Sequence, residues 1–524
     1  MSEKITIYDT TLRDGSQTEG VSFTVNDKLK ITEKLDDLGV HYIEGGWPGS
    51  NPKDKEYFKL VKAKKLKNSR IAAFGSTRRA GITAAKDPNL RALVSSQAKT
   101  LTIFGKSWDL HVTDVIKTTL YENLKMIKDS VSYLKNKKRD VFYDAEHFFD
   151  GYKNNPEYAL KTILAAEEGG ADCIVLCDTN GGTLPNEVRR IVGEVKEQMT
   201  APLGIHTHND LQMGVANSLA AVEMGAVQVQ GTFNGLGERC GNADLCTIVG
   251  ILHTKLKRKS IPDSKVKKLT ETAYYLSEVS NMKLADNHAF VGHSAFAHKG
   301  GVHIDAMLKN PLAYEHVNPE LVGNHRRFIT SELAGKMPII IKARQMDVTL
   351  DKKSKEAKKL LKDLQNKEHS GYQFEAADAS FELFMKRALN KYKPFFKLEG
   401  FKVSTEKRFD SRIFAEASLR LEVNGKEKFS AADGDGPVDA LDSALREALH
   451  EFYPGLADMH LTDYKVRVLE SKAGTAAKVR VLIESQDKTD SWTTVGVHEN
   501  IIEASWEALI DSIEYKLLKD KKGK

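Results

Sequence analysis

The sequence predicts an α/β fold: a (β/α)8 barrel, the TIM-barrel architecture, followed by helical linker subdomains and a C-terminal α+β domain. Three observations lead to this fold class. Apolar, β-branched runs alternate with helical patterns through about residue 250. Polar residues follow each of these runs, as they do at the carboxyl ends of barrel strands. The last part of the chain instead carries alternating strand patterns and an internal repeat.

The apolar runs have the length and composition of buried parallel strands. An open doubly wound sheet is the competing topology, but no Gly-x-Gly-x-x-Gly follows the first strand, which argues against its dinucleotide-binding form. We predict eight strands, at Ile5–Thr11, Tyr42–Trp47, Ile71–Gly75, Leu101–Phe104, Val141–Ala145, Cys173–Cys177, Gly204–Thr207 and Val227–Thr232.

The segments between these strands carry helix signals. One has apolar residues at helical spacing and stops at Gly39, whereas others open at Pro156 and Pro185, in the first-turn position that proline favours. After the barrel we expect a helix at 271–281, a loop-rich region at 288–323 and an exposed charged helix at 352–366.

The C-terminal part contains an internal repeat. Residues 438–445 correspond to residues 502–509 at a constant offset, and each is a helix pattern with small residues on one face, preceded by alternating strands. Two βββα-like units leave a pseudo-twofold seam, which suits dimerisation and small effectors. We therefore predict a barrel at 1–270, linker subdomains contributing to the active site at 271–395, and a regulatory and dimerisation domain at 396–524.

Composition excludes several classes of function. The 524 residues carry a formal net charge of only +6, and the basic runs at 352–367 and 519–524 contain no interleaved aromatic residues, so a nucleic-acid partner is not expected. No apolar run approaches the roughly 20 residues of a membrane helix, and a cytoplasmic location is predicted. The four cysteines lack Cys-x-x-Cys spacing and are interpreted as reduced thiols.

The first candidate site is the strand end around His206 and His208. Successive strand side chains alternate, so these two imidazoles share one face and can bind one divalent metal. Asp14 follows the first strand and can complete the set, with Arg13 beside it. The alternatives are a surface strand with two solvated histidines and an ordinary Arg–Asp salt bridge. In a closed barrel, however, only strand eight separates these two strand ends, which favours the metal site.

Four motifs in order resemble the family of 2-isopropylmalate, homocitrate and citramalate synthases, which are metal-dependent barrels that condense acyl-CoA. They are Thr-Leu-Arg-Asp-Gly at 11–15, His-Thr-His-Asn-Asp at 206–210, Asn-Gly-Leu-Gly-Glu-Arg-Cys-Gly-Asn at 234–242 and Gly-Val-His-Ile-Asp at 301–305. Within the family, residues 45–54 and 492–497 resemble the long form of citramalate synthase.

The resemblance implies roles for ten residues. Asp14, His206 and His208 would bind a divalent ion (Mn, Mg, Zn or Co), with Asn242 as the fourth ligand or as a neighbour that contacts the ion through water. Arg13 would stabilise the developing alkoxide and, with Gln17 and Thr179, bind the acceptor substrate. Glu146, His303 and Tyr314 would remove the proton from acetyl-CoA. Glu146 as a rim salt-bridge partner and the other two as packed loop residues are the alternatives, and an extra residue near His111 leaves its role open.

The implied activity is condensation of acetyl-CoA with pyruvate in a homodimer that isoleucine inhibits. Other 2-oxo acids are the alternative acceptors, because one pocket methyl group is worth only ~1–3 kcal/mol in specificity. A lyase, a carboxyltransferase and a non-enzymatic amino-acid-binding protein are further alternatives. The C-terminal repeat argues against the lyase, the lack of a biotin-bearing domain against the carboxyltransferase, and the intact set of rim residues against the binding protein.

Overall fold

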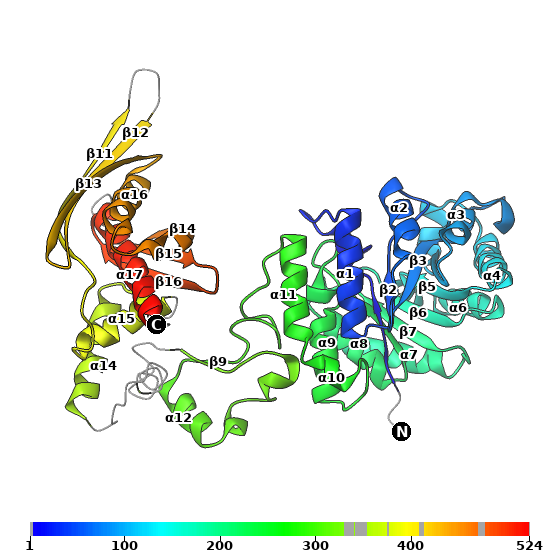
Figure 1. Ribbon diagram of the computed structural model, residues 1–524. Helices are drawn as coiled ribbons and strands as arrows, with labels where there is room; N and C mark the ends of the chain where they lie inside the picture. The colour runs from blue at the N-terminus through cyan, green and yellow to red at the C-terminus, as the bar shows by residue number, and fades with distance from the viewer. Residues whose placement is uncertain are drawn as a thin grey trace. The chain divides into compact units, whose positions relative to one another are not determined.

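The computed structural model describes residues 4–329, 340, 354–374, 377–407, 413–469 and 477–522. The chain forms two compact units (Figure 1). The first contains Met1–Phe296 and His316–Arg326, and the second contains Ala297–Glu315 and Arg327–Lys524. The predicted boundaries at 270 and 395 remain predictions.

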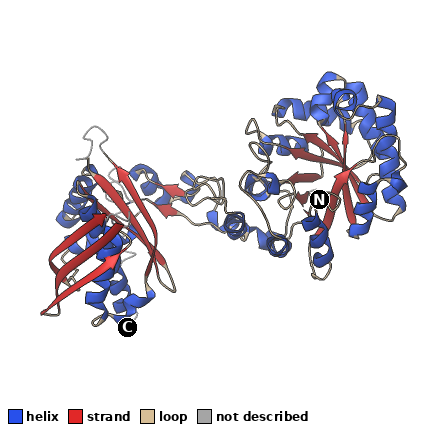
Figure 2. Ribbon diagram, turned by 90° about the horizontal axis from the view of Figure 1, so that it is seen from above, coloured by secondary structure: helices blue, strands red, loops and turns tan. Residues whose placement is uncertain are grey.

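The first unit is a closed barrel of eight parallel strands, seen end-on in Figure 2. Strand β1 pairs with β2 on one side and with β8 on the other, which closes the sheet and excludes the open doubly wound topology. The strands are β1 (Thr6–Asp9), β2 (Tyr42–Glu44), β3 (Arg70–Ser76), β4 (Thr100–Lys106), β5 (Asp140–Glu146), β6 (Cys173–Asp178), β7 (Leu203–Thr207) and β8 (Gln228–Gly231).

Helices surround the barrel and bury their apolar faces against it (Figure 2). Local signals fix their starts: Thr24 forms a capping box with Asp27, and Asn155 caps the helix that begins at Pro156. The helices are α1 (Val25–Leu38), α2 (Pro52–Val61), α3 (Pro88–Ser96), α4 (Leu120–Asn136), α5 (Phe148–Asn154), α6 (Pro156–Glu168), α7 (Pro185–Lys196), α8 (Gly214–Glu223), α9 (Leu245–Thr254), α10 (Asp263–Val266) and α11 (Leu269–Ser280).

The barrel interior is a packed core rather than a pore. Alternate strand residues point inward and form an apolar cluster of Tyr8, Ala72, Phe142, Cys173, Val175 and Cys177. The charged residues that point inward, such as Glu44 and Asp144, lie nearer the carboxyl ends of their strands. The charged side chains of the interior therefore lie toward that end of the barrel.

Residues 316–326 return to the barrel unit after the chain has left it. Asn324 donates two hydrogen bonds through Nδ2, to the carbonyl oxygens of Phe290 at 2.9 Å and of Gly292 at 3.0 Å. Thr270 on α11 donates to the carbonyl oxygen of Val322 at 2.8 Å. Val322 itself is fully buried in the core of this unit. The returning segment is thus part of the barrel unit.

The second unit begins with short elements and helices. The region predicted to be rich in loops contains α12 (Gly301–Lys309), which is followed by a 3-10 turn at Pro311–Ala313. The predicted charged helix is α14 (Lys355–His369), which buries Ala357, Leu360 and Leu364, and α15 (Asp378–Ala388) comes next. Two short strands, β9 (Ala297–His298) and β10 (Arg327–Phe328), pair in parallel.

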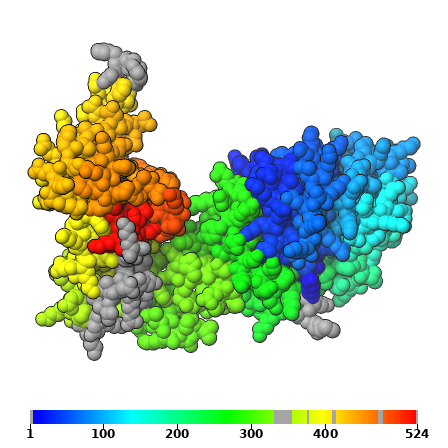
Figure 3. All heavy atoms as spheres, in the orientation of Figure 1, coloured from blue at the N-terminus to red at the C-terminus, as the bar shows by residue number. Residues whose placement is uncertain are grey.

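The predicted repeat is confirmed as two βββα units with antiparallel three-stranded sheets. Ala440 and Ala444 in the first helix, and Ala504 and Ala508 in the second, are buried, and their small side chains permit close packing on the sheets. Figure 3 shows only a small red area of the second helix between neighbouring elements. The units are β11 (Lys397–Lys407), β12 (Ile413–Val423), β13 (Lys426–Gly434) and α16 (Pro437–His450), then β14 (His460–Val468), β15 (Val479–Gln486), β16 (Ser491–His498) and α17 (Ile501–Lys522).

Two predictions about the chain as a whole concern membranes and thiols. Among the helices that the structure describes, none is long and apolar enough to cross a bilayer. The four cysteines are free thiols, of which Cys240 is exposed and the other three are buried.

Candidate metal centre

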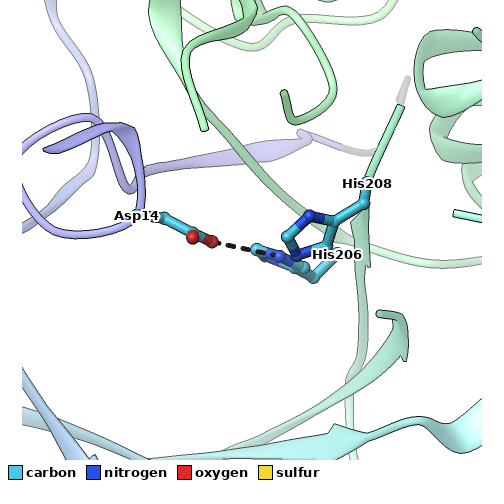
Figure 4. A group of neighbouring side chains, drawn as sticks. All are labelled: Asp14, His206 and His208. Carbon is cyan, nitrogen blue, oxygen red and sulfur yellow. Dashed lines mark ion pairs between the residues drawn. The ribbon is translucent and has the colours of Figure 1, made fainter. Parts of the chain in front are cut away.

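Three side chains predicted to bind a metal lie together at the carboxyl end of the barrel. Asp14 follows β1, His206 is on β7, and His208 lies just beyond the end of β7. Ligand atoms from all three lie within 4.8 Å of one another, and the three residues are buried. Nε2 of His206 lies 3.4 Å from Oδ2 of Asp14, and Figure 4 shows the carboxylate facing this ring.

The barrel topology brings these residues together from distant parts of the sequence. Both β1 and β7 pair with β8, so their carboxyl ends lie at the same edge of the sheet. The residues after β1 turn sharply, because the carbonyl oxygen of Thr10 accepts hydrogen bonds from the N–H groups of Arg13, Asp14 and Gly15. This turn holds the Asp14 carboxylate beside the two imidazoles.

The electrostatics of the cluster favour one charged and two neutral groups. Burial raises the pKa of Asp14, but the Arg13 guanidinium, together with the two imidazoles and Asn242, outweighs burial and holds that pKa below its ordinary value. Burial lowers the pKa of His206. For His208, burial and then repulsion by a positive charge on His206 lower the pKa to about 3. A carboxylate beside two neutral imidazoles is the protonation state that metal binding requires.

Asn242, the fourth predicted ligand, is placed by the glycine-rich loop after β8. Gly241 adopts φ +87°, and a Cβ atom there would lie 2.0 Å from the carbonyl oxygen of Gly235, so only glycine fits. The N–H of Asn242 donates to that same oxygen at 3.2 Å. Asn242 is fully buried and forms an isolated antiparallel bridge with His208. The loop therefore fixes Asn242 next to a metal-ligand candidate.

The residues present fit a divalent metal. Nδ1 of His208 and both amide atoms of Asn242 are buried and have no hydrogen-bond partner among the described residues. Buried polar atoms in proteins are almost always partnered, so a cluster of such atoms indicates a ligand. A set of carboxylate, imidazole and amide oxygen donors suits Mg, Mn, Zn or Co, and it does not select one of them.

Arg13 is held rigidly beside this cluster. Its Nε donates to Oε1 of Glu44 at 2.5 Å, and its guanidinium carbon lies 3.7 Å from the centre of the Phe74 ring. Glu44 is fully buried and also accepts a hydrogen bond from the Tyr8 hydroxyl at 2.6 Å. The guanidinium is therefore fixed in position, with Nη1 3.5 Å from Oδ1 of Asp14.

Comparison with known proteins gives full-length relatives. An (R)-citramalate synthase of Aquifex aeolicus is 55% identical over 99% of both chains, and one of Geobacter sulfurreducens is 54% identical over 98% of both chains. A 2-isopropylmalate synthase of Clostridium kluyveri is 33% identical over 98% of this chain and 96% of its own. The chain belongs to the (R)-citramalate synthase family.

Family models agree with this assignment along the chain. Residues 4–275 match the HMGL-like family, residues 290–369 the homocitrate synthase post-HMGL domain-like family, and residues 375–517 the LeuA allosteric (dimerisation) domain. As a member of the citramalate synthase family, the protein is a condensing enzyme of the acyltransferase class.

Glu146, predicted from resemblance to the citramalate synthase family as a base, closes β5 on the same rim. Its carboxylate forms an ion pair with Nζ of Lys106, at the end of β4. Glu146 therefore forms the rim salt bridge that was the alternative to a catalytic role. Such an ion pair orients the carboxylate and is compatible with a role as base. Sequence reasoning missed Lys106.

The predicted substrate-binding residues lie on the same side of the barrel. Thr179 directly follows β6, and its Oγ1 accepts a hydrogen bond from the N–H of His147 at 2.9 Å. Its carbonyl oxygen accepts one from Arg239 at 2.8 Å. Gln17 ends the short 3-10 helix after Asp14 and is exposed. Both side chains are thus on loops that follow barrel strands.

His303 and Tyr314 belong to the second unit. Their rings are stacked, with centroids 4.2 Å apart and planes inclined by 26°. His303 is on α12 and exposed, and Tyr314 follows the next 3-10 turn with 45% of its surface exposed. The structure therefore brings these two predicted residues to each other, and their action on the barrel site stays a prediction.

His111, whose role was left open, lies in the turn after β4. Its ring centroid is 4.1 Å from that of His147. Burial and then the charge of His147 lower its pKa, and its Nδ1 is buried without a hydrogen-bond partner in the described structure. Like His208, it is a rim histidine with a buried nitrogen that has no hydrogen-bond partner among the described residues.

One contact of the metal centre was absent from the sequence prediction. Nδ1 of His206 lies 3.1 Å from Oε1 of Gln230 on β8, and Nε2 of Gln230 lies 3.0 Å from Oδ1 of Asp144 on β5. The available signal was the Gln-Val-Gln run in a buried strand, where two inward-facing amides need partners.

Proposed function

We propose that the protein condenses acetyl-CoA with pyruvate and hydrolyses the thioester, which yields (R)-citramalate and free CoA. The observation that carries the proposal is the buried cluster of Asp14, His206 and His208 beside a fixed Arg13. The choice of pyruvate is supported by five (R)-citramalate synthases at 45–55% identity, against 32–33% for the 2-isopropylmalate synthases.

The metal centre would be formed by Asp14, His206 and His208, with Asn242 as a fourth ligand. When bound, a divalent ion supplies Lewis-acid polarisation of the keto group of the acceptor. Which divalent ion the protein uses is left to experiment, since the donor set accepts several.

The acceptor would be bound and activated by residues on the rim. The Thr179 hydroxyl, with Gln17, would donate to the carboxylate of pyruvate. Arg13, held by Glu44 and stacked on Phe74, would stabilise the negative charge that develops on the keto oxygen. Because the guanidinium is already in place, it needs no reorganisation during the reaction.

The donor needs a base. Glu146, oriented by Lys106 and assisted by His303 and Tyr314, would take a proton from the methyl group of acetyl-CoA. The methyl carbon then bonds to the keto carbon, and a proton returns to the keto oxygen to give a hydroxyl. Water adds to the thioester carbonyl, the C–S bond breaks, and CoA leaves as the thiol.

The second unit would provide regulation and assembly. The match of residues 375–517 to an allosteric dimerisation domain supports a homodimer with isoleucine as feedback effector. The amino-acid-binding protein without catalysis is disfavoured because the rim residues of the catalytic site are all present. A cytoplasmic location remains a prediction.

The test is a panel of acceptors. The purified full chain is incubated with acetyl-CoA, Mn²⁺ or Mg²⁺, and pyruvate, 2-oxoisovalerate or 2-oxoglutarate, while a thiol reagent measures CoA release. We expect pyruvate to give the highest kcat/KM and isoleucine to inhibit more strongly than leucine. A preference for another acceptor would reassign the substrate, and no thiol release with any acceptor would refute the proposed reaction.

A further inference from the structure

A row of three buried side chains crosses the barrel from β5 to β7. Asp144 accepts a hydrogen bond from Nε2 of Gln230 at 3.0 Å, and Oε1 of Gln230 lies 3.1 Å from Nδ1 of His206. The exposed fractions are 4% for Asp144, 0% for Gln230 and 5% for His206. The proposed reaction uses only the last of these residues, so Gln230 and Asp144 need another explanation.

The direction of the hydrogen bonds in this row follows from which side-chain atoms can donate and which can accept. A primary amide has one oxygen that accepts and one nitrogen that donates, so its two ends cannot play the same role. Asp144 accepts at Oδ1, which requires the amide nitrogen of Gln230 to face it. Burial raises the pKa of Asp144, and a protonated carboxyl group can donate as well as accept, so the orientation rests on the contact itself, in which Nε2 of Gln230 donates to Oδ1. In this orientation the amide oxygen faces Nδ1 of His206 at 3.1 Å.

The amide oxygen in turn decides the tautomer of His206. An oxygen acceptor at Nδ1 stabilises the proton on Nδ1 and leaves a lone pair on Nε2. Nε2 is the atom that lies 3.4 Å from Asp14 and faces the metal centre. The opposite tautomer would place a hydrogen where a metal must bind.

We propose that Gln230, oriented by Asp144, is a positioning residue that holds His206 in the metal-binding tautomer. The inference rests on the metal centre of the proposed function. His208 provides an internal contrast, because its Nδ1 is buried without a partner in the part of the chain that the structure describes. One imidazole of the site is therefore fixed before the metal binds, and the other is not.

The experiment measures Mn²⁺ affinity of the full chain after removal of metal with a chelator, by isothermal titration calorimetry. Gln230→Met keeps the length and volume of the side chain but removes both hydrogen bonds. Loss of such a partner of a metal-binding histidine costs about 10- to 100-fold in metal affinity, and this is the expected rise in Kd. The unfolding temperature of each metal-free variant is recorded beside the Kd.

The chain offers a matched control on the same strand. Gln228 is also buried at 3% exposure and also on β8, but it does not contact His206, and its Oε1 has no partner among the described residues. Gln228→Met should change the Kd less than about 3-fold. An unchanged Kd in Gln230→Met, or an equal rise in both variants, would overturn the proposal.

Two further variants separate positioning from packing. Gln230→Glu can reproduce the same polarity with its acid proton in place of the amide N–H, and we expect its Kd to stay nearer to wild type than that of Gln230→Met. Asp144→Leu removes the acceptor of the amide N–H, so the amide of Gln230 is no longer oriented, and this variant should raise the Kd by a smaller factor than Gln230→Met. A normal Kd in Asp144→Leu would contradict the part assigned to Asp144. Failure of the wild-type chain to bind Mn²⁺ would instead refute the metal centre itself.

Discussion

The carboxyl end of the barrel and a cavity in the second unit both gather charged side chains, but they use them differently. The cavity has a volume of about 370 Å³, and its walls include Tyr372, Arg387, Glu507 and Asp511. There Arg387 pairs with Asp511 at 2.8 Å, and the Tyr372 hydroxyl donates to Glu507 at 2.6 Å. At the barrel, by contrast, His208 and Asn242 keep buried polar atoms without partners in the described structure.

This difference separates a site built to receive a ligand from a cluster built to hold a fold. In the second unit, Ser380 donates to Asp511 at 2.6 Å and accepts from the N–H of Val495 at 3.0 Å, which ties α15 to α17 and β16. Removing a charged group should therefore cost stability in the cavity and metal binding in the barrel. The predictions that follow test this contrast, from the largest effect to the smallest.

Asp14→Ala should abolish function at little cost in stability. It removes one of the three proposed metal ligands. Loss of a residue that only contacts a metal ligand costs up to roughly 100-fold in metal affinity, so Mn²⁺ affinity should fall by more than that here, and CoA release should fall with it. The free energy of unfolding of the metal-free protein should fall only slightly, because the low pKa of Asp14 shows that its neighbours more than offset the cost of burying the carboxylate. Calorimetry and thermal unfolding, each with and without Mn²⁺, measure both quantities. If the metal-free variant were much less stable than metal-free wild type, the cluster would serve to stabilise the fold and not to bind a metal.

Asp511→Ala should show the reverse. The buried Ser380 hydroxyl loses its acceptor and Arg387 loses its ion pair, so the free energy of unfolding of the second unit should fall by about 3 kcal/mol. Urea unfolding followed by tryptophan fluorescence reports this change, since Trp506 lines the cavity. Mn²⁺ affinity should be unchanged, and a large loss of metal binding would break the comparison.

Glu514→Gln should change how stability depends on pH. Glu514 on α17 is 2% exposed and accepts the N–H of Phe395 at 3.2 Å, and burial outweighs this hydrogen bond and raises the pKa of Glu514 to about 7. Because the folded state binds the proton more tightly than the unfolded state, wild-type stability falls as pH rises from about 4.5 to about 7. The variant should be more stable by roughly 3 kcal/mol at pH 8 and nearly equal at pH 4. Glu499→Gln, at an exposed position, is the control, and parallel pH profiles for wild type and Glu514→Gln would contradict the prediction.

Lys367→Met should have the smallest effect. The Lys367 ammonium lies 4.1 Å from the centre of the Tyr372 ring and is exposed, where a cation–π contact is worth about 0.5–1 kcal/mol. We expect a loss of stability of that size in the second unit and no change in metal affinity. A gain in stability would show that the Lys367 charge does not stabilise the second unit.

The sequence was a good guide to the barrel because its strands are buried on both faces. All eight predicted strands exist, and the largest errors are at their ends. The strand predicted to reach Thr11 stops at Asp9, since Thr10 already accepts the three hydrogen bonds of the following turn. The cluster of Asp14, His206 and His208 could be found because strand pairing alone brings their strand ends together.

Other features depend on contacts that no local pattern encodes. Gln230 is recognisable only through partners 24 and 86 residues away in the sequence, and Lys106 only through Glu146 on the next strand. The helix α12 was missed because it buries only Ile304 and Met307, too few for a clear helical period. Residues 492–497 are predicted as a family motif and not as a strand, although β16 completes the second sheet.

The return of residues 316–326 to the barrel unit limits how this protein can be dissected. The chain passes between the two units at three places, after Phe296, after Glu315 and after Arg326. A fragment that stops at residue 296 would lack buried Val322 and the amide of Asn324, and would leave the carbonyl oxygens of Phe290 and Gly292 without their donor. A catalytic barrel cut out as a simple N-terminal piece should therefore unfold at a lower temperature than the barrel of the whole chain, and adding a peptide of residues 316–326 should restore part of that difference.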